Sequence, residues 1–412
     1  MVTRLKFATI ACGLLFTFES VCAQNWTQWR GPGRDGIVDL SAVSTWPDSL
    51  TRVWKVAVGT GHASPLVMGD RGYLHSRIGN EEVVSCLEIE DGSLIWQHRY
   101  EAPYEMNSAA RRHGKGPKST PLLYRKHVYT LGISGILSCL SAETGNLLWQ
   151  KSFESEFENT SPLYGTATSP IAWRNLVIAY FGGDDRGALV AFDHGSGDLR
   201  WRWDGDGPGY TSTVIGEFGG VEQVITQSQN FCLGLAAATG EVLWKVPFTT
   251  AWDQNSVTPV LFNGRVIFSG LDKGTFSVKP EKDVQGTWWA REVWRSEDVS
   301  MYMSSAIALN DQLFGFGHKK KGRYFRLDAG SGNTGWLSEG RQAKNVALIA
   351  SGDIVLALQD EAQLLVIDAD VDSFRVLRRY RVADSPTWAH PVIVGSDILI
   401  KDEKTLSKWR IR

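Results

Sequence analysis

The chain has 412 residues and a formal net charge of −2, with 43 Lys and Arg residues against 45 Asp and Glu residues. Because the two signs of charge are interspersed, this composition argues against a nucleic-acid partner or a strongly charged membrane surface. Glycine (42 residues) and tryptophan (17 residues) are abundant, which disfavours long helices and favours aromatic strands joined by tight turns.

The N-terminal residues 1–23 have the pattern of a secretory signal peptide. A basic start and an apolar run over 7–18 are followed by small residues before a predicted cut at Gln24. The apolar run is too short to span a bilayer comfortably, and no later stretch is long and apolar enough. We therefore predict a cleaved leader, a periplasmic or secreted location, and a mature monomer with no transmembrane segment.

Residues 24–50 are predicted to form an N-terminal strap. They include NWTQWRGPGRDGIV (25–38), in which glycines and a proline exclude regular structure while Trp26 and Trp29 require burial. We expect this segment to lie across a face or side of the folded domain as a clasp. A binding motif is the alternative interpretation of the same residues.

The remainder, 51–412, contains a repeated phrase. CLSAETGNLLW (139–149) resembles CLEIEDGSLIW (86–96), LVAFDHGSGDLRW (189–201) and GLAAATGEVLW (234–244). Aligned on the closing tryptophan, the repeats are about 40 to 55 residues long, which is typical of a four-stranded propeller blade. The closing tryptophans are Trp54, Trp96, Trp149, Trp201, Trp244, Trp294 and Trp336.

Each repeat predicts four short strands. A step such as Thr120-Pro121 precedes the first strand, a polar turn leads to the second, and the repeated phrase supplies the third, a hairpin turn and the fourth. Gly145 can take the positive φ of that turn, and Trp149 is placed to fill the wedge between neighbouring blades. The phrase is therefore interpreted as structural. The cysteines Cys86, Cys139 and Cys232 fall on its strands, which predicts buried thiols without a disulfide framework.

Counting repeats gives an all-β, eight-bladed β-propeller of four-stranded antiparallel blades. The eighth blade begins at Thr387 and is one strand short, and RVWKVAV (52–58) supplies the missing outer strand. Pairing the two ends of the chain closes the ring and removes an open sheet edge. The other seven blades are predicted over 62–100, 118–154, 166–204, 211–248, 255–296, 302–339 and 344–382.

These motifs resemble the PQQ-like repeat β-propeller family, whose blades carry Ala-x-Asp-x-x-Thr-Gly-x-x-x-Trp. NWTQWRGPGRDGIV, GPKSTPLL (116–123) and GALVAFDHGSGDLRW (187–201) are similar to one exported bacterial subfamily. The resemblance spans the mature chain and implies the fold. It implies no single activity, because the family includes quinoprotein dehydrogenases and non-catalytic scaffold proteins such as the outer-membrane assembly lipoprotein.

The loops from each outer strand to the next inner strand are predicted to converge on the mouth of the central channel. The longest is EAPYEMNSAARRHGKGPK (101–118), and aromatic, amide and charged residues at such a mouth indicate a ligand or partner site. The basic run 318–323 is interpreted instead as a solvated loop tip. The candidate mouth residues are His62, Asn107, Arg112, His113, Lys118, Tyr164, Tyr210, Asp253, Asn255, Tyr302, Lys344, Trp388 and His390.

The resemblance also implies what a quinoprotein dehydrogenase would need: Ca²⁺ held by a Glu, Asn and Asp set, an Asp base and, often, adjacent cysteines. This sequence has no adjacent cysteines and no C-x-x-C-H haem motif, and no third carboxylate accompanies Asp253 and Asn255 by spacing. PQQ and Ca²⁺ are therefore disfavoured, and no catalytic or metal-binding residue is predicted.

The leading functional hypothesis is an exported, non-catalytic binding or scaffold module whose protein, small-molecule or carbohydrate ligand docks at the channel mouth. A PQQ-dependent or other small-molecule oxidoreductase is one alternative. A carbohydrate-binding propeller is the other.

Overall fold

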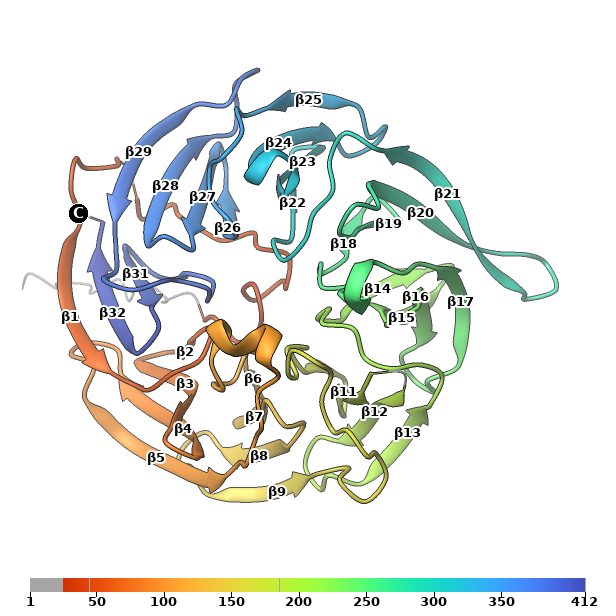
Figure 1. Ribbon diagram of the computed structural model, residues 1–412, viewed down its shortest axis with the longest axis horizontal. Coiled ribbons are helices and arrows are strands. Elements are labelled where there is room, and N and C mark those ends of the chain that lie inside the picture. Colours follow the sequence, from red (N-terminus) through yellow and green to blue (C-terminus); the bar gives the residue numbers. More distant parts are fainter. Residues whose placement is uncertain (1–24, 44, 185, 412) are drawn as a thin grey trace, which may run out of the picture.

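A ring of eight four-stranded antiparallel sheets surrounds a central axis (Figure 1). The computed structural model describes residues 25–43, 45–184 and 186–411, so the predicted leader lies outside the described residues. The predicted all-β, eight-bladed β-propeller is confirmed. Across the described ranges, no helix is both long enough and apolar enough to cross a membrane.

In seven blades the four strands follow chain order from the axis outward. Blades 1 and 2 contain β2 (Leu66–Met68), β3 (Arg71–Ile78), β4 (Glu81–Glu88), β5 (Leu94–Glu101), β6 (Leu122–Tyr124), β7 (His127–Leu131), β8 (Leu137–Ser141) and β9 (Leu147–Lys151). Blades 3 and 4 contain β10 (Ile171–Trp173), β11 (Leu176–Gly183), β12 (Arg186–Asp193), β13 (Leu199–Trp203), β14 (Val214–Phe218), β15 (Val221–Gln227), β16 (Phe231–Ala236) and β17 (Val242–Pro247).

The remaining blades repeat the pattern, and blade 5 has the longest hairpin, which projects beyond the ring (Figure 1). Blades 5 and 6 contain β18 (Val260–Phe262), β19 (Arg265–Ser269), β20 (Thr275–Lys282), β21 (Trp288–Ser296), β22 (Ile307–Leu309), β23 (Gln312–Gly317), β24 (Arg323–Asp328) and β25 (Thr334–Leu337). Blades 7 and 8 contain β26 (Val346–Ser351), β27 (Ile354–Gln359), β28 (Gln363–Asp368), β29 (Val376–Arg381), β30 (Val392–Val394), β31 (Asp397–Lys401) and β32 (Thr405–Arg410).

The fourth strand of blade 8 comes from the other end of the chain. Strand β1 (Thr51–Ala57) pairs antiparallel with β32, with Thr51 opposite Arg410 and Ala57 opposite Thr405. This is the predicted ring closure, and it covers the outer edge that β32 would otherwise expose.

The repeated tryptophans join each blade to the next. The Trp96 indole N–H donates to the carbonyl of Ala142 at 3.2 Å. A Cβ added to Gly145, in the same turn, would lie 2.5 Å from that indole ring, and Gly145 has φ +74°. The turn therefore requires glycine for two reasons: its φ is positive, and a Cβ would collide with the indole of Trp96. The same bond joins Trp54, Trp149, Trp201 and Trp294 to the carbonyls of Ile89, His194, Ala237 and Ala329.

Two tryptophans depart from this pairing because the next blade lacks the short glycine turn. Trp244 lies beside the long hairpin of blade 5 and donates to Gln223 of its own blade at 2.8 Å. Trp336 packs against Phe374 of blade 7, with ring centroids 5.7 Å apart. The phrase thus specifies contacts between neighbouring blades. Cys86, Cys139 and Cys232 are buried and free, as predicted.

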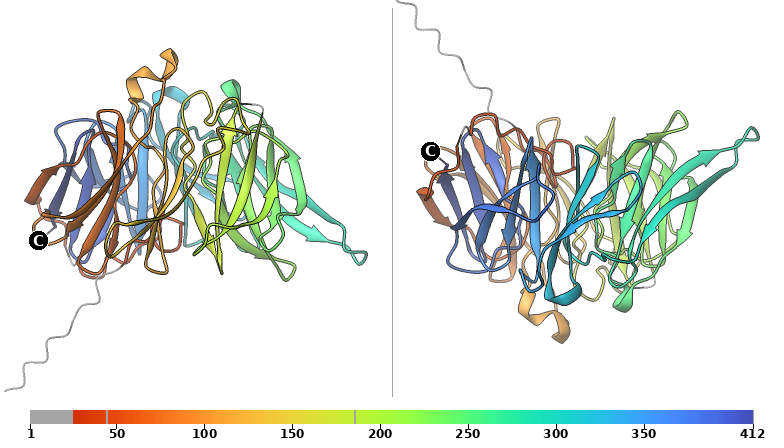
Figure 2. Two further views of the ribbon diagram at one scale, coloured as in Figure 1. Left: turned by 90° about the horizontal axis from the view of Figure 1, so that it is seen from below. Right: turned by 90° about the horizontal axis from the view of Figure 1, so that it is seen from above.

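The strap over 25–50 crosses one end of the central channel. Trp26 pairs with Val67 of β2 on one side, and Ile37 bridges to Ala350 of β26 on another. Between these points the Trp29 indole donates to Thr258 of blade 5 at 3.0 Å. The strap (red in Figure 2) lies on the face opposite the protruding short helix η1 (Ser108–His113).

Two buried arginines anchor the strap near the axis. The Arg34 guanidinium donates to the backbone carbonyls of Ser169 at 2.7 Å, Pro170 at 3.1 Å and Thr213 at 2.5 Å. Arg30 donates to a backbone carbonyl just before β22 at 2.5 Å. Burial lowers the pKa of Arg34 to about 9 and that of Arg30 to about 10, so both are charged at neutral pH. WRGPGRDG therefore anchors the strap to the inner ends of blades 3, 4 and 6.

Candidate functional site

Three short 3₁₀ helices mark the face of the ring opposite the strap, which we call the η face (Figure 2). They are η1, η2 (Ala251–Asp253) and η3 (Lys319–Lys321). Helices η1 and η2 belong to loops that lead from one blade to the next, whereas η3 connects β23 to β24 within blade 6. Sequence-variable loops on a regular scaffold are where binding sites usually lie.

Three predicted residues from separate loops meet on the η face, in what we call the His–Trp cluster. The ring centroids of His62 and His113 lie 6.3 Å apart, and those of Trp388 lie 5.6 Å from His62 and 5.0 Å from His113. A ring nitrogen of His62 lies 2.9 Å from the carbonyl oxygen of His113. The cluster joins the loop before β2, helix η1 and the loop between blades 7 and 8.

Both imidazoles in this cluster are neutral near pH 7. Burial, followed by the positive charge of Lys118, lowers the pKa of His62 to about 3. The same two causes lower the pKa of His113 to about 4. The cluster is therefore an uncharged aromatic surface, suited to stacking and hydrogen bonding, and it offers no group that titrates near neutral pH.

A second group of predicted residues lies in the loops before blades 2, 3, 4 and 6. Lys118 Nζ donates to the carbonyl of Tyr164, and burial lowers the lysine pKa to about 8. The rings of Tyr164 and Tyr210 are 5.8 Å apart, and the Tyr210 hydroxyl accepts the Tyr164 amide at 3.2 Å. Tyr302 donates to Gln254. These side chains connect adjacent loops with one another and form the rim of the mouth.

Four predicted residues on the η face contact their own loops or lie exposed there. Asn107 caps η1, because its Oδ1 accepts the Ala109 amide at 2.9 Å. Arg112 is exposed on η1, and Asp253 is exposed on η2. Lys344 is exposed on the loop between blades 6 and 7.

The structure separates two predicted residues from this surface. Asn255 is fully buried, and its Nδ2 donates to the carbonyls of Ser228, Gln229 and Phe248 at 2.8 to 3.1 Å. Its amide thus joins blades 4 and 5. His390 is buried below the mouth, 4.5 Å from the ring of Trp29 in the strap. Both residues contribute to packing between parts of the protein in this structure, and neither is exposed at the mouth.

The described residues do not fit the cofactor that the fold family implies. A PQQ site of the expected type needs a calcium ion held by a Glu, Asn and Asp set, for which Asp253 and Asn255 are the candidate ligands. Asp253 is exposed on η2, whereas Asn255 is fully buried. Asn255, one of two candidate ligands, uses its amide within the protein, where Thr250 also donates to its Oδ1 at 3.1 Å. We therefore derive no step through PQQ.

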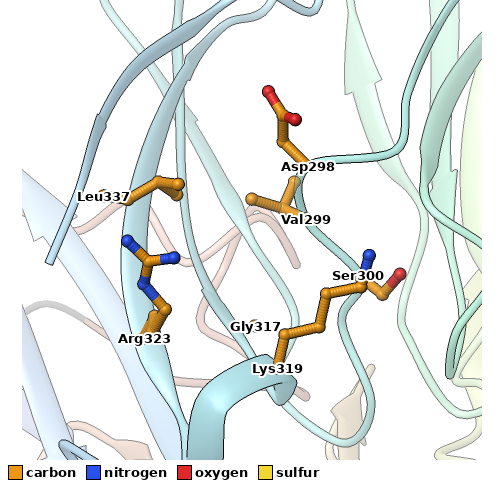
Figure 3. Close-up of a pocket in the computed structure, with 7 residues that line it drawn as sticks. All are labelled: Asp298, Val299, Ser300, Gly317, Lys319, Arg323 and Leu337. Atoms are coloured by element: carbon orange, nitrogen blue, oxygen red, sulfur yellow. The ribbon is translucent and has the colours of Figure 1, made fainter. Parts of the chain in front are cut away.

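Two cavities flank η3, and only one has room for a ligand. The smaller, about 10 Å³, lies beneath η3 between blades 5 and 6, where the Arg323 guanidinium lies beside Leu337 (Figure 3). It could hold one water molecule. The larger, about 560 Å³, lies between η3 and the loop between blades 6 and 7. Sequence reasoning missed this second cavity because it treated the basic run as a solvated loop tip. The position of that run between two strands of one blade was the available signal.

Comparison with known proteins agrees with this architecture. The family model described as outer membrane protein assembly factor BamB matches residues 41–201 and 80–338. The chain belongs to this family of PQQ-like repeat propellers.

One relative of this chain in sequence is a dehydrogenase subunit. The chain is 26% identical over 227 residues to methanol dehydrogenase [cytochrome c] subunit 1 of Paracoccus denitrificans, across 51% of this chain and 33% of that protein. It therefore spans about a third of that relative's length.

Two solved structures share the fold. BamB from Moraxella catarrhalis matches with a TM-score of 0.61 and 15% identity, covering 88% of this chain and 99% of that one. Quinohemoprotein alcohol dehydrogenase from Comamonas testosteroni matches with a TM-score of 0.67 and 13% identity, covering 94% of this chain and 80% of that one. At these identities the structural matches establish the propeller and leave its role open.

Proposed function

We propose that this protein is an exported, non-catalytic binding propeller whose ligand docks on the η face. The observation that carries the proposal is the composition of that face. Loops from several blades bring together neutral histidines, tryptophans, tyrosines and cations, and the described residues include no group of three or more His, Cys, Asp and Glu side chains able to hold a metal. Aromatic rings with a few polar groups are the usual lining of small-molecule and carbohydrate sites.

Trp252 on η2 supports this assignment. Its side chain is 74% exposed, and its backbone has φ +61°. A bulky residue in this left-handed region is strained, and strain of this kind is concentrated at functional sites. An exposed indole in the loop next to Tyr302 offers a flat surface on which a sugar ring or another planar ligand can stack.

The strap at the opposite end of the channel supports the assignment of ligand binding to the η face alone. The strap crosses that end and fixes it through Arg30 and Arg34, which donate to backbone carbonyls of blades 3, 4 and 6. A ligand near the axis would therefore approach from the η face.

The test is thermal unfolding of the mature chain with a panel of neutral and acidic oligosaccharides. We expect at least one class to raise Tm, and Trp252→Ala to abolish the shift. Trp289→Ala is the matched control, because Trp289 is 42% exposed on the blade 5 hairpin, away from the η face. An equal loss in both variants, or no shift with any member, would contradict the proposal.

The match to a methanol dehydrogenase subunit favours one alternative, a PQQ-dependent oxidoreductase. The same assay with PQQ plus Ca²⁺ distinguishes it. We expect no change in Tm, because Asn255 is already fully hydrogen-bonded within the protein. A clear stabilisation by the quinone and Ca²⁺ together would replace the binding proposal with this one.

A further inference from the structure

The larger cavity on the η face has a lining dominated by positive charge. It occupies about 560 Å³ between blades 6 and 7, within the size range of small-molecule sites. Its walls are η3 with its flanking residues, the loop between β25 and β26, and the turn after β27. The side chains that face it are His318, Lys321, Arg341, Gln342, Lys344 and Glu361.

The three strong cations of this pocket have no acidic partner. Lys321, Arg341 and Lys344 are exposed, and none lies within 4.0 Å of a carboxylate oxygen among the residues that the structure describes. Glu361 is the one acidic residue in the lining. The neighbouring Asp360 is buried, where its carboxylate accepts the backbone amide of Lys344 at 3.1 Å. The pocket thus carries an excess of positive charge that the protein does not neutralise.

The backbone holds these cations in place. Lys321 and Arg341 both have φ +66°, and Lys320 has φ +54°, so three basic residues adopt a conformation that favours glycine. Two bonds connect the loops: the Arg341 amide donates to the Lys320 carbonyl at 3.1 Å, and the Gln342 amide donates to the Gly322 carbonyl at 3.1 Å. These bonds between the two loops fix the backbone positions of Lys321 and Arg341 relative to each other.

Close packing between the two loops adds to this rigidity. A Cβ on Gly322 would lie 2.2 Å from the backbone oxygen of Ala343, and one on Gly340 would lie 2.8 Å from that of Lys320. The glycines therefore allow the loops to touch, and the charged side chains project from a fixed frame. A ligand that binds here has to order these side chains, but the two loops are already held together.

We propose that this pocket binds a saccharide that carries a phosphate or sulfate group. Guanidinium and ammonium groups form strong charge-assisted hydrogen bonds to such oxyanions. The cavity is larger than a single oxyanion needs, and the side-chain oxygen of Gln342 and the carboxylate of Glu361 supply polar atoms for sugar hydroxyls. This inference rests on the proposed function in one respect, which is that a ligand binds on the η face.

The test is isothermal titration of the mature protein with glucose 6-phosphate, glucose 6-sulfate, inorganic phosphate and glucose. We expect both charged sugars to bind, inorganic phosphate to bind more weakly, and glucose to give no signal. Arg341→Gln and Lys321→Gln should each weaken binding by about tenfold or more, as expected for the loss of a hydrogen bond to a charged group. Thermal unfolding of each variant checks that it is folded.

Lys126→Gln is the matched control, because Lys126 is also exposed and has φ +68°, but lies in the turn between β6 and β7 on the other face. We expect it to bind like the wild type. The proposal is overturned if neither charged sugar binds, if inorganic phosphate binds as tightly as they do, or if Lys126→Gln weakens binding equally. A neutral oligosaccharide response that depends on Trp252, without any response to the charged sugars, would remove this inference and leave the proposed function standing.

Discussion

Two groups of cations, one on each face of the ring, use positive charge in opposite ways. On the strap face, Arg30 and Arg34 are buried and donate to backbone carbonyls of several blades. On the η face, Lys321, Arg341 and Lys344 are exposed around a cavity and form no ion pair with a described carboxylate. The comparison suggests the criterion behind the proposed site: the first group of cations is bonded within the protein, whereas the second is left without an acidic partner.

The largest expected effect on stability comes from removing an arginine that anchors the strap. Arg34→Met would remove the charged donor and leave the carbonyls of Ser169, Pro170 and Thr213 without it. We expect the free energy of unfolding to fall by about 3 kcal/mol or more, as for other losses of a buried charged hydrogen-bond partner. Urea unfolding measures this change. Arg200→Met, at an exposed position on β13, should stay within about 0.5 kcal/mol of the wild type. Equal effects would show that Arg34 does not anchor the strap.

A second prediction concerns the pH dependence of stability that His390, buried beside the strap, produces. Burial, followed by the charge of Arg30, lowers the pKa of His390 to about 3 from its usual value of 6.5. Between these values the unfolded chain binds a proton at this residue and the folded chain does not. Stability is therefore fully present above pH 6.5 and falls as the pH drops, by up to about 1.4 kcal/mol per pH unit.

His390→Phe should remove this contribution while keeping a ring beside Trp29. Urea unfolding between pH 7 and pH 5 should show a shallower pH dependence in the variant than in the wild type. A residual dependence of the same sign remains, because the pKa values of His62 and His113 are lowered as well. Parallel curves for the two proteins would mean that His390 is not kept neutral by the fold.

The smallest expected effect on stability lies on the η face. Arg341→Gln should change the free energy of unfolding by no more than about 0.5 kcal/mol, because Arg341 has an exposed side chain without an ion-pair partner among the described residues. Urea unfolding beside Arg34→Met gives the comparison directly. A loss approaching that of Arg34→Met would assign Arg341 a structural role and weaken the contrast between the faces.

The fold could be predicted because its determinants are local and repeated. Each turn glycine, such as Gly145, lies under the indole of the preceding blade. The number of residues between successive copies of the phrase therefore gives the length of each blade in the sequence. The strand that closes the ring could also be identified, since blade 8 lacks one strand and 52–58 has the required pattern.

The site was less predictable because loop paths are set by contacts that the repeat does not encode. Sequence reasoning placed Asn255 at the mouth, whereas hydrogen bonds to Ser228 and Phe248 turn its amide into the interior. The basic run at 318–323 lines a cavity only because backbone bonds hold it against the loop that contains Arg341. No periodic pattern in the sequence indicates those bonds.

Hydrogen–deuterium exchange of the mature chain, with and without saturating glucose 6-phosphate, tests the contrast between the two faces most directly. The account predicts slower exchange in 317–323 and 339–345, which border the cavity between blades 6 and 7. It predicts no change in 26–38, where Arg30 and Arg34 are already bonded within the protein. Protection confined to the strap, or no protection in either loop of the cavity, would contradict it.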